Sequence, residues 1–375
     1  MSKDHARSSA HRTVYGAALS LVLALAYLSV LAGAALAAPS VLTLRESGGQ
    51  DTMWLVPSSG GAATAAGTLP GTANWGMQSP DGTTVVYSPD GNKPELWVGY
   101  GPLAPKTISL KSAGIKTLRW LVWSNNSTVM IAGSTKANDN DEYNDRLYTV
   151  DLSSGKVTSF RNLKGTEPSV DPASGKVAYT VLKKLDNGTA HNNHTPLIRE
   201  SLKLTTLTGA GAGRTIGSRQ YRPFADMRFF AGSLLSPGGG YIVAGQTGSD
   251  VRITYTLYGA DSGTPWLTLF APALQVQAWS PDGKKLALGG STAVSGDDST
   301  PCVFVDDVTT GTLTRTGDSL FLADPGMIVG AAWSLDGQLL ADVLADGQGD
   351  VLLLDPSDLS RVTKLGAGHL SVWVK

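Results

Sequence analysis

A short pattern of apolar and polar positions recurs along the chain. In "QAWSPDGKKLALGG", residues 277–290, an apolar stretch ends in tryptophan, a serine and a Pro-Asp-Gly turn follow, and a second apolar stretch begins. Proline sets the backbone angle of the second turn position, aspartate tolerates the third, and glycine takes the left-handed conformation. The pattern therefore predicts a strand, a tight turn and an antiparallel second strand.

Six copies of this pattern can be aligned. The other five are "MQSPDGTTVVYS" from Met77, "LVWSNNSTVMIAG" from Leu121, "PSVDPASGKVAYT" from Pro168, "SLLSPGGGYIVAG" from Ser233 and "AAWSLDGQLLADV" from Ala331. Their anchor residues are Ser79, Ser124, Asp171, Ser236, Ser280 and Ser334, which lie 45, 47, 65, 44 and 54 positions apart. Periods of this length are typical of propellers.

Each copy is followed by further short alternating stretches, such as "RLYTVDLSSG" and "VFVDDVTTG". No long amphipathic helical pattern occurs after residue 40, so we predict an all-β fold of four-stranded antiparallel units. A single such sheet leaves two faces and two edges uncovered, and stacking in a ring covers them. The tryptophans at 123, 279, 333 and 373 recur at one place in the unit, which predicts packing between blades.

The two ends of the chain predict a seventh blade. "HLSVWVK", residues 369–375, matches an inner strand without a hairpin after it, and residues 41–67 match the three strands that this blade lacks. We therefore expect a seven-bladed β-propeller closed by pairing of N- and C-terminal strands, with six blades as the alternative. Residues 38–375 would form this single domain.

The "WSPDGKKLA" signature resembles the TolB-type propeller repeats, which are distant relatives of the WD-repeat family. The match is strict at Ser79–Gly82 and Ser280–Gly283 and loose in the other copies. The resemblance implies a protein or peptide ligand of the cell envelope.

Residues 1–37 have the layout of a signal peptide. Lys3, Arg7 and Arg12 precede an uncharged apolar run, and the small-residue triplet at 35–37 suggests cleavage before Ala38. An uncleaved membrane anchor through residues 14–38 is the alternative. In both cases we expect the propeller outside the cytoplasm, secreted or periplasmic, and in contact with a membrane only if the leader is uncleaved.

The charge and the cysteine content limit the classes of partner and the covalent links that we expect. The chain has 30 basic and 31 acidic residues, and loss of residues 1–37 leaves 27 and 30, which argues against nucleic-acid binding. Cys302 is the only cysteine, so no intramolecular disulfide forms. We expect a monomer.

The lengths of the loops predict which rim of the propeller binds the ligand. The loops between second and third strands expand to residues 134–146, 184–196 and 290–301, whereas the Pro-Asp-Gly turns on the opposite rim are short. The candidate ligand-binding residues in these loops are Asp139, Asp141, Glu142, Asp145, His191, His194, Asp297 and Asp298.

These loops contain two candidate metal sites. The carboxylates of loop 134–146 could bind Ca²⁺, but the loop lacks the glycine and terminal glutamate of an EF-hand, which favours a solvated acidic loop. His191 and His194 offer only two of the three or four ligands of a transition-metal site, which favours a polar surface loop. We therefore expect no cofactor.

Catalytic motifs were not found. The chain has no Gly-x-Ser-x-Gly elbow and no P-loop, and only three histidines follow the leader. These observations and the predicted leader favour an exported binding module, not an enzyme. The TolB-type resemblance implies that it recognises a protein or peptide, which we expect at its loop-rich rim. The alternative is a propeller lyase or hydrolase acting on an extracellular polysaccharide or peptide.

Overall fold

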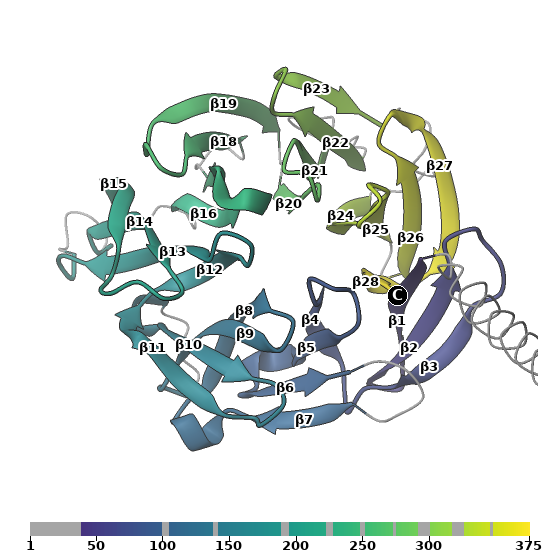
Figure 1. Ribbon diagram of the computed structural model, residues 1–375, viewed down its shortest axis with the longest axis horizontal. Coiled ribbons are helices and arrows are strands. Elements are labelled where there is room, and N and C mark those ends of the chain that lie inside the picture. The colour runs from purple at the N-terminus through teal and green to yellow at the C-terminus, as the bar shows by residue number, and fades with distance from the viewer. Residues whose placement is uncertain are drawn as a thin grey trace, which may run out of the picture.

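Seven four-stranded antiparallel sheets form a closed ring (Figure 1). The computed structural model describes residues 39–99, 105–137, 142–188, 195–222, 228–247, 252–272, 275–291, 301–316, 326–345 and 348–375. The prediction of a seven-bladed all-β propeller is confirmed, and the six-bladed alternative is excluded.

The strands follow the chain from blade to blade, and each blade is given from its inner strand outward. Blade 1 contains β4 (Ala73–Gln78), β5 (Val85–Pro89), β6 (Glu95–Val98) and β7 (Lys106–Ser109). Blade 2 contains β8 (Thr117–Asn125), β9 (Thr128–Ser134), β10 (Arg146–Asp151) and β11 (Val157–Lys164). Blade 3 contains β12 (Thr166–Asp171), β13 (Lys176–Lys184), β14 (Ile198–Thr206) and β15 (Arg214–Tyr221).

The second half of the ring has the same order. Blade 4 contains β16 (Arg228–Leu235), β17 (Tyr241–Thr247), β18 (Arg252–Gly259) and β19 (Pro265–Pro272). Blade 5 contains β20 (Gln275–Trp279), β21 (Lys285–Ser291), β22 (Pro301–Asp307) and β23 (Thr312–Arg315). Blade 6 contains β24 (Gly326–Trp333), β25 (Leu339–Ala345), β26 (Gln348–Asp355) and β27 (Asp358–Ala367). Short 3-10 turns occur at η1 (Asp90–Asn92), η2 (Lys111–Ala113), η3 (Glu142–Asn144) and η5 (Pro237–Gly239).

Blade 7 closes the ring with strands from both ends of the chain. Its inner strand is β28 (His369–Val374), and its outer strands are β1 (Ser40–Ser47), β2 (Gln50–Pro57) and β3 (Thr64–Thr68). β28 and β1 are antiparallel, with Val41 opposite Trp373. The predicted strand exchange is therefore present.

The recurring serine organises the turn that follows it. In blade 5, Ser280 Oγ donates to Asp282 (2.6 Å) and accepts the backbone N–H of Lys285 (2.9 Å). The turn needs glycine at its end, since Gly283 has φ of 68°. Ser79 makes the same bonds to Asp81 and to the N–H of Thr84. The pattern recurs because it closes the same hairpin in different blades.

The recurring tryptophans join neighbouring blades. Each lies on an inner strand, is buried, and donates its indole N–H to a backbone carbonyl on the inner strand of the preceding blade. The pairs are Trp123 with Met77 (3.1 Å), Trp279 with Leu234 (3.3 Å), Trp333 with Ala278 (3.2 Å) and Trp373 with Ala332 (3.1 Å). The predicted packing between blades is confirmed.

Two details differ from the sequence pattern. The turn at Ser124 lacks proline and glycine, and Asn125 replaces them by accepting the N–H of Ser127 with its side chain (2.8 Å). Trp266 does not share the position of the recurring tryptophans: it lies on the fourth strand β19 and is 52 % exposed.

The antiparallel order gives the ring two distinct rims. The turn rim carries the turns from first to second and from third to fourth strands, and the loop rim carries the loops from second to third strands and the connections between blades. Within the described residues, no helix is long and apolar enough to cross a membrane. The predicted leader, residues 1–37, lies outside them.

Candidate functional site

Most of the predicted ligand-binding residues lie outside the described part of the chain. These are Asp139, Asp141, His191, His194, Asp297 and Asp298. The Ca²⁺ loop is described only at its two ends, so its metal binding stays a prediction. Among the described residues, no three His, Cys, Asp or Glu side chains are placed to hold a metal ion.

The structure places Asp145 in the interior and Glu142 at the half-buried turn η3. Asp145 is fully buried, and its carboxylate pairs with Arg119 Nε at 3.0 Å. Burial raises the pKa of Asp145 to about 7, although Arg119 acts in the opposite direction. Its carboxylate thus faces an inner strand of its own blade and not the solvent.

Buried carboxylates at the start of third strands anchor the next blade. Asp51 Oδ2 accepts the N–H of Ala73, the first residue of the neighbouring inner strand (2.8 Å). Glu200 accepts the N–H of Phe230 in the same way (3.3 Å). These contacts fix the loop-rim ends of the inner strands.

Every inner strand is irregular near this end. The register shifts lie between Ala73 and Trp75, Leu118 and Trp120, Thr166 and Ser169, Arg228 and Ala231, Val276 and Ala278, and Ile328 and Gly330, and in β28 opposite Leu42–Leu44. Such bulges redirect side chains and are common beside binding sites. In blade 7 the bulge includes Leu370, whose φ is 48°.

His369 stands next to this bulge, at the loop-rim end of β28. Its Nε2 lies 3.4 Å from Asp51 Oδ1, and the imidazole is 30 % exposed whereas the carboxylate is fully buried. Among the described residues, Asp51 Oδ1 accepts no hydrogen bond within normal hydrogen-bond geometry, so the imidazole is its nearest charge partner in an ion pair. A partly exposed imidazole is therefore positioned through its Nε2 by a buried carboxylate.

A second buried carboxylate lies on the other side of β28. Asp342 Oδ2 accepts the N–H of Ser371 (2.6 Å), and the Ser371 hydroxyl donates to Thr43 Oγ1 (3.0 Å). Thr43 in turn donates to the carbonyl of His369 (3.3 Å). Because Ser371 bonds Thr43 and not the imidazole, this cluster is not a Ser-His-Asp triad.

The carboxylates favour a protonated imidazole. The hydrogen-bonding interaction with Asp51 raises the pKa of His369, and the charges of Asp51, Asp342 and Glu46 act in the same direction. Burial raises the pKa of Asp342 to about 6. His369 can thus present a charged N–H donor at the rim, or act as a proton donor and acceptor.

Sequence reasoning missed this site. His369 was counted only as one of three histidines after the leader, and the aspartates that surround it lie in other strands. The sequence did contain one signal: His369 begins the predicted inner strand 369–375. This position lies on the loop rim, which was predicted to bind the ligand.

The comparisons with known proteins show the fold alone. No protein-family model matches the chain, and no curated protein sequence matches it. Puromycin hydrolase is 16% identical with a TM-score of 0.54, and the match covers 88% of this chain and 52% of that protein. The chain thus spans about half the length of that hydrolase.

Two smaller propellers are also similar. Oligogalacturonate lyase in complex with manganese is 15% identical with a TM-score of 0.50, and the match covers 82% of this chain and 84% of the lyase. TolB from Acinetobacter baumannii is 15% identical over 89% of this chain and 82% of that one, with a TM-score of 0.44. This similarity is too weak to assign the chain to the TolB-type repeats, whose resemblance stays a prediction.

These matches correct one expectation. The absence of catalytic motifs led us to predict that the chain is not an enzyme, and that prediction is wrong, because structures with the same fold include a hydrolase and a lyase.

Proposed function

We propose that the chain is an exported propeller that binds a protein or peptide ligand at its loop rim, with His369 as a ligand-contacting residue. The observation that carries this proposal is the partly exposed imidazole held by the buried Asp51. The imidazolium Nδ1–H would donate to a carbonyl or carboxylate oxygen of the ligand. The export component rests on the predicted leader at residues 1–37.

A second candidate function rests on the same pair. An imidazole oriented by a buried carboxylate and partly open to solvent is the arrangement of a general acid–base catalyst. In that case the ligand would be a peptide or polysaccharide that the protein cleaves, with His369 moving the proton.

The first experiment is selection of a phage-displayed peptide library against the purified protein. Enriched peptides should bind at least ten-fold more weakly to His369→Gln and equally well to Ser357→Ala, which changes the opposite rim. Binding should weaken as the pH rises through the raised pKa of His369, since the protonated ring is the donor. Failure to enrich any peptide, or enrichment insensitive to His369→Gln, would contradict the binding proposal.

Mass spectrometry of the enriched peptides separates the two candidates. Cleavage that is lost in His369→Gln supports the acid–base role, and intact peptides support binding without turnover. Asp51→Asn should lower the pKa of His369 in a histidine NMR titration, because it removes the partner that raises it. An unchanged titration would show that the pair is not formed in solution.

A further inference from the structure

The same position on the turn rim is filled differently at successive blade boundaries. This position is the first residue of the second strand. It either pairs with the anchor residue of the turn or donates its backbone N–H to the side chain of that anchor residue. It is Lys176 in blade 3, Tyr241 in blade 4 and Lys285 in blade 5.

At the first two boundaries this residue has a partner. Lys176 Nζ crosses to blade 4, where it binds Asp261 Oδ1 (2.7 Å) and the carbonyl of Gly239 (2.9 Å). Tyr241 packs instead against the Trp266 ring of its own blade, with centroids 5.6 Å apart. Two other turns are also contacted by a basic side chain of the preceding blade. Lys106 donates to the carbonyl of Leu152, and Arg161 donates to the carbonyl of Thr206.

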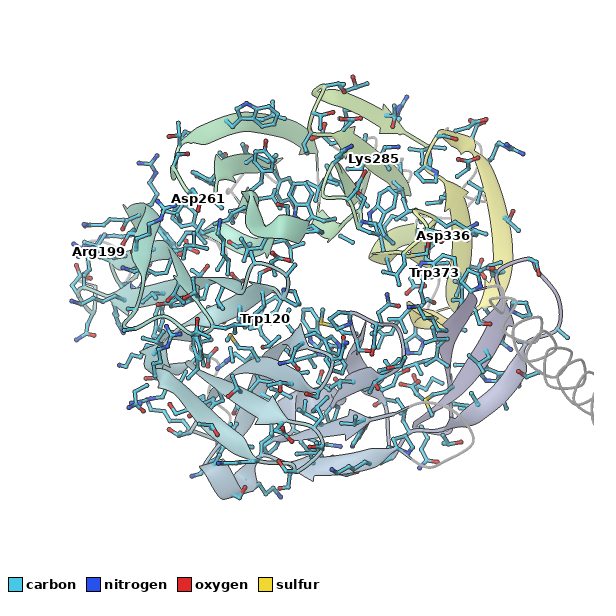
Figure 2. The ribbon with its side chains drawn as sticks, viewed as in Figure 1. Trp120, Arg199, Asp261, Lys285, Asp336 and Trp373 are labelled. Carbon is cyan, nitrogen blue, oxygen red and sulfur yellow. The ribbon has the colours of Figure 1, made fainter. Side chains whose placement is uncertain are left out.

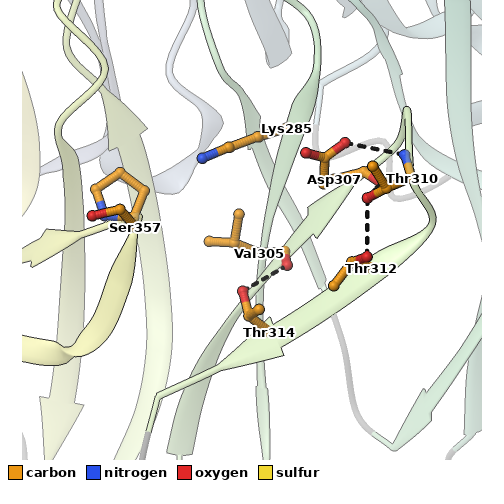
Figure 3. A pocket seen from close by; sticks show the side chains of 8 residues that line it. Lys285, Val305, Asp307, Thr310, Thr312, Thr314 and Ser357 are labelled. Carbon is orange, nitrogen blue, oxygen red and sulfur yellow. Dashed lines mark hydrogen bonds between the residues drawn. The ribbon is translucent and has the colours of Figure 1, made fainter.

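At the boundary between blades 5 and 6, blade 6 supplies no such partner among the described residues, and Lys285 interacts electrostatically with Asp307 of its own blade. The turn of blade 6 carries Pro356 and Ser357 where that of blade 4 carries Ala260 and Asp261. Among the described residues, the Lys285 ammonium forms no hydrogen bond or ion pair, and it points into a cavity of about 280 Å³ (Figure 3). Figure 2 marks Asp261 and Lys285 on neighbouring parts of the ring.

The cavity is lined by side chains that can form hydrogen bonds with a hydroxylated ligand. Its lining includes Val305 and Pro356 and the hydroxyl side chains of Thr310, Thr312, Thr314 and Ser357. The hydroxyl of Thr310 donates to Thr312 (3.0 Å), which leaves the Thr312 hydroxyl able to donate to a ligand.

Asp307 supplies an acceptor opposite the lysine. Its Oδ1 accepts from the backbone and hydroxyl of Thr309 and from the N–H of Thr310, and no described residue donates to Oδ2. A simple anion would satisfy Lys285 but would be repelled by Asp307. A molecule that carries a carboxylate and hydroxyl donors satisfies both.

We propose that this cavity binds a small hydroxylated carboxylate of the acidic-sugar class, whose carboxylate takes the place that Asp261 has beside Lys176. Its hydroxyls donate to Asp307 and exchange hydrogen bonds with the threonines. The cavity is slightly below the roughly 300–1,000 Å³ of pockets for drug-sized ligands, so it suits a single sugar ring. The site lies on the turn rim, opposite His369, and does not depend on the proposed function of that residue.

The test is binding of glucuronate to the full chain, followed by calorimetry and by NMR. Glucuronate should bind, and glucose and acetate should each bind at least ten-fold more weakly. Lys285→Gln should weaken glucuronate at least ten-fold, whereas Lys284→Gln, the matched change of the adjacent exposed lysine, should leave it unchanged.

Ser357→Asp supplies a second, independent variant. It restores the acceptor found at Asp261, so Lys285 should pair internally, the melting temperature should hold or rise, and glucuronate binding should be lost. Absence of glucuronate binding to the unmodified chain overturns the proposal. Equal binding of sulfate or acetate, or equal losses in the two lysine variants, also overturns it, because the cavity would then respond to charge alone.

Discussion

Each ring tryptophan connects two blades through one indole N–H and one backbone carbonyl. Trp333 is a representative case, since it is buried and belongs to an apolar cluster formed by blades 5 and 6. Its partner carbonyl, that of Ala278, lies on the preceding inner strand. Loss of the donor leaves a partly buried acceptor without this hydrogen bond.

We therefore expect Trp333→Phe to lower the free energy of unfolding by ~1–3 kcal/mol, through the unpaired carbonyl and the smaller ring. Trp266→Phe is the matched control, because Trp266 is 52 % exposed and should change stability little. Chemical denaturation measures both. Equal effects would mean that the indole bond contributes nothing to the contact between blades.

Two adjacent aspartates are predicted to have opposite pH effects on stability. Burial raises the pKa of Asp306 from 3.8 to about 6, whereas hydrogen bonds from Thr309 lower the pKa of Asp307. Asp306 is fully buried, and neither of its carboxylate oxygens has a hydrogen-bond partner among the described residues. The stability that Asp306 provides is therefore full below pH 3.8 and is lost as the pH rises through about 6.

Asp306→Asn should accordingly stabilise the fold at pH 8, by up to ~3 kcal/mol for two pKa units, and should have a much smaller effect near pH 4. Asp307→Asn should do the reverse, because the contribution of Asp307 is present above its ordinary pKa and is lost as the pH falls through its lowered pKa. Melting curves from pH 3 to 8 test both variants. Parallel pH profiles for the two would contradict the assignment.

At the scale of elements, the turn rim brings successive hairpins into contact. Gly283 has φ of 68°, and a Cβ at this position would lie 2.9 Å from the carbonyl oxygen of Pro237 in the preceding blade. Gly311 has φ of 69°, but no atom of the described residues lies within 4 Å of the corresponding position. The two glycines thus have the same backbone conformation and different surroundings.

Gly311→Ala should lower the free energy of unfolding by about 1 kcal/mol, because alanine is strained in the left-handed backbone conformation. Gly283→Ala should cost more, because the methyl group also forces the hairpins of blades 4 and 5 apart. Comparison of the two melting temperatures separates the contact between blades from the backbone term. Equal losses would show that the hairpins separate at no cost.

The elements were predictable where one physical need repeats in every blade. The serine, the turn and the tryptophans recur because each closes a hairpin or joins two inner strands, and the fold follows from them. The candidate site was not predictable in this way. His369 acts with Asp51 and Asp342, which come from separate strands and are brought together only by ring closure. Lys285 differs from Lys176 in the residue that the next blade places beside it and in its opposite residue on the third strand, which is Asp307 in blade 5 and Thr206 in blade 3.

At the scale of the whole molecule, blade 7 determines whether the ring is closed. β28 pairs with β1, Trp373 donates to Ala332 of blade 6, and the N–H of Lys375 donates to Gly82 of blade 1 (3.2 Å). One strand therefore contacts three blades.

Deletion of residues 369–375 should lower the melting temperature of the entire propeller, because it removes the inner strand of blade 7 and both of its neighbouring contacts. Deletion of Lys375 alone is the control and should have a small effect. A synthetic peptide of residues 365–375 should restore part of the lost stability in a concentration-dependent way. A truncated protein that melts like the full chain would refute the role of this closure.

The late position of β28 also sets an order of events during synthesis. Thr43 and His369, which meet in blade 7, are 326 positions apart, so closure joins the first strand of the propeller with its last. Until then the inner edge of β1 lacks its partner, and such an edge invites aggregation or proteolysis. The time between the two ends is thus the period in which the chain is most vulnerable, and any factor that shields β1 during this period would raise the yield of closed rings.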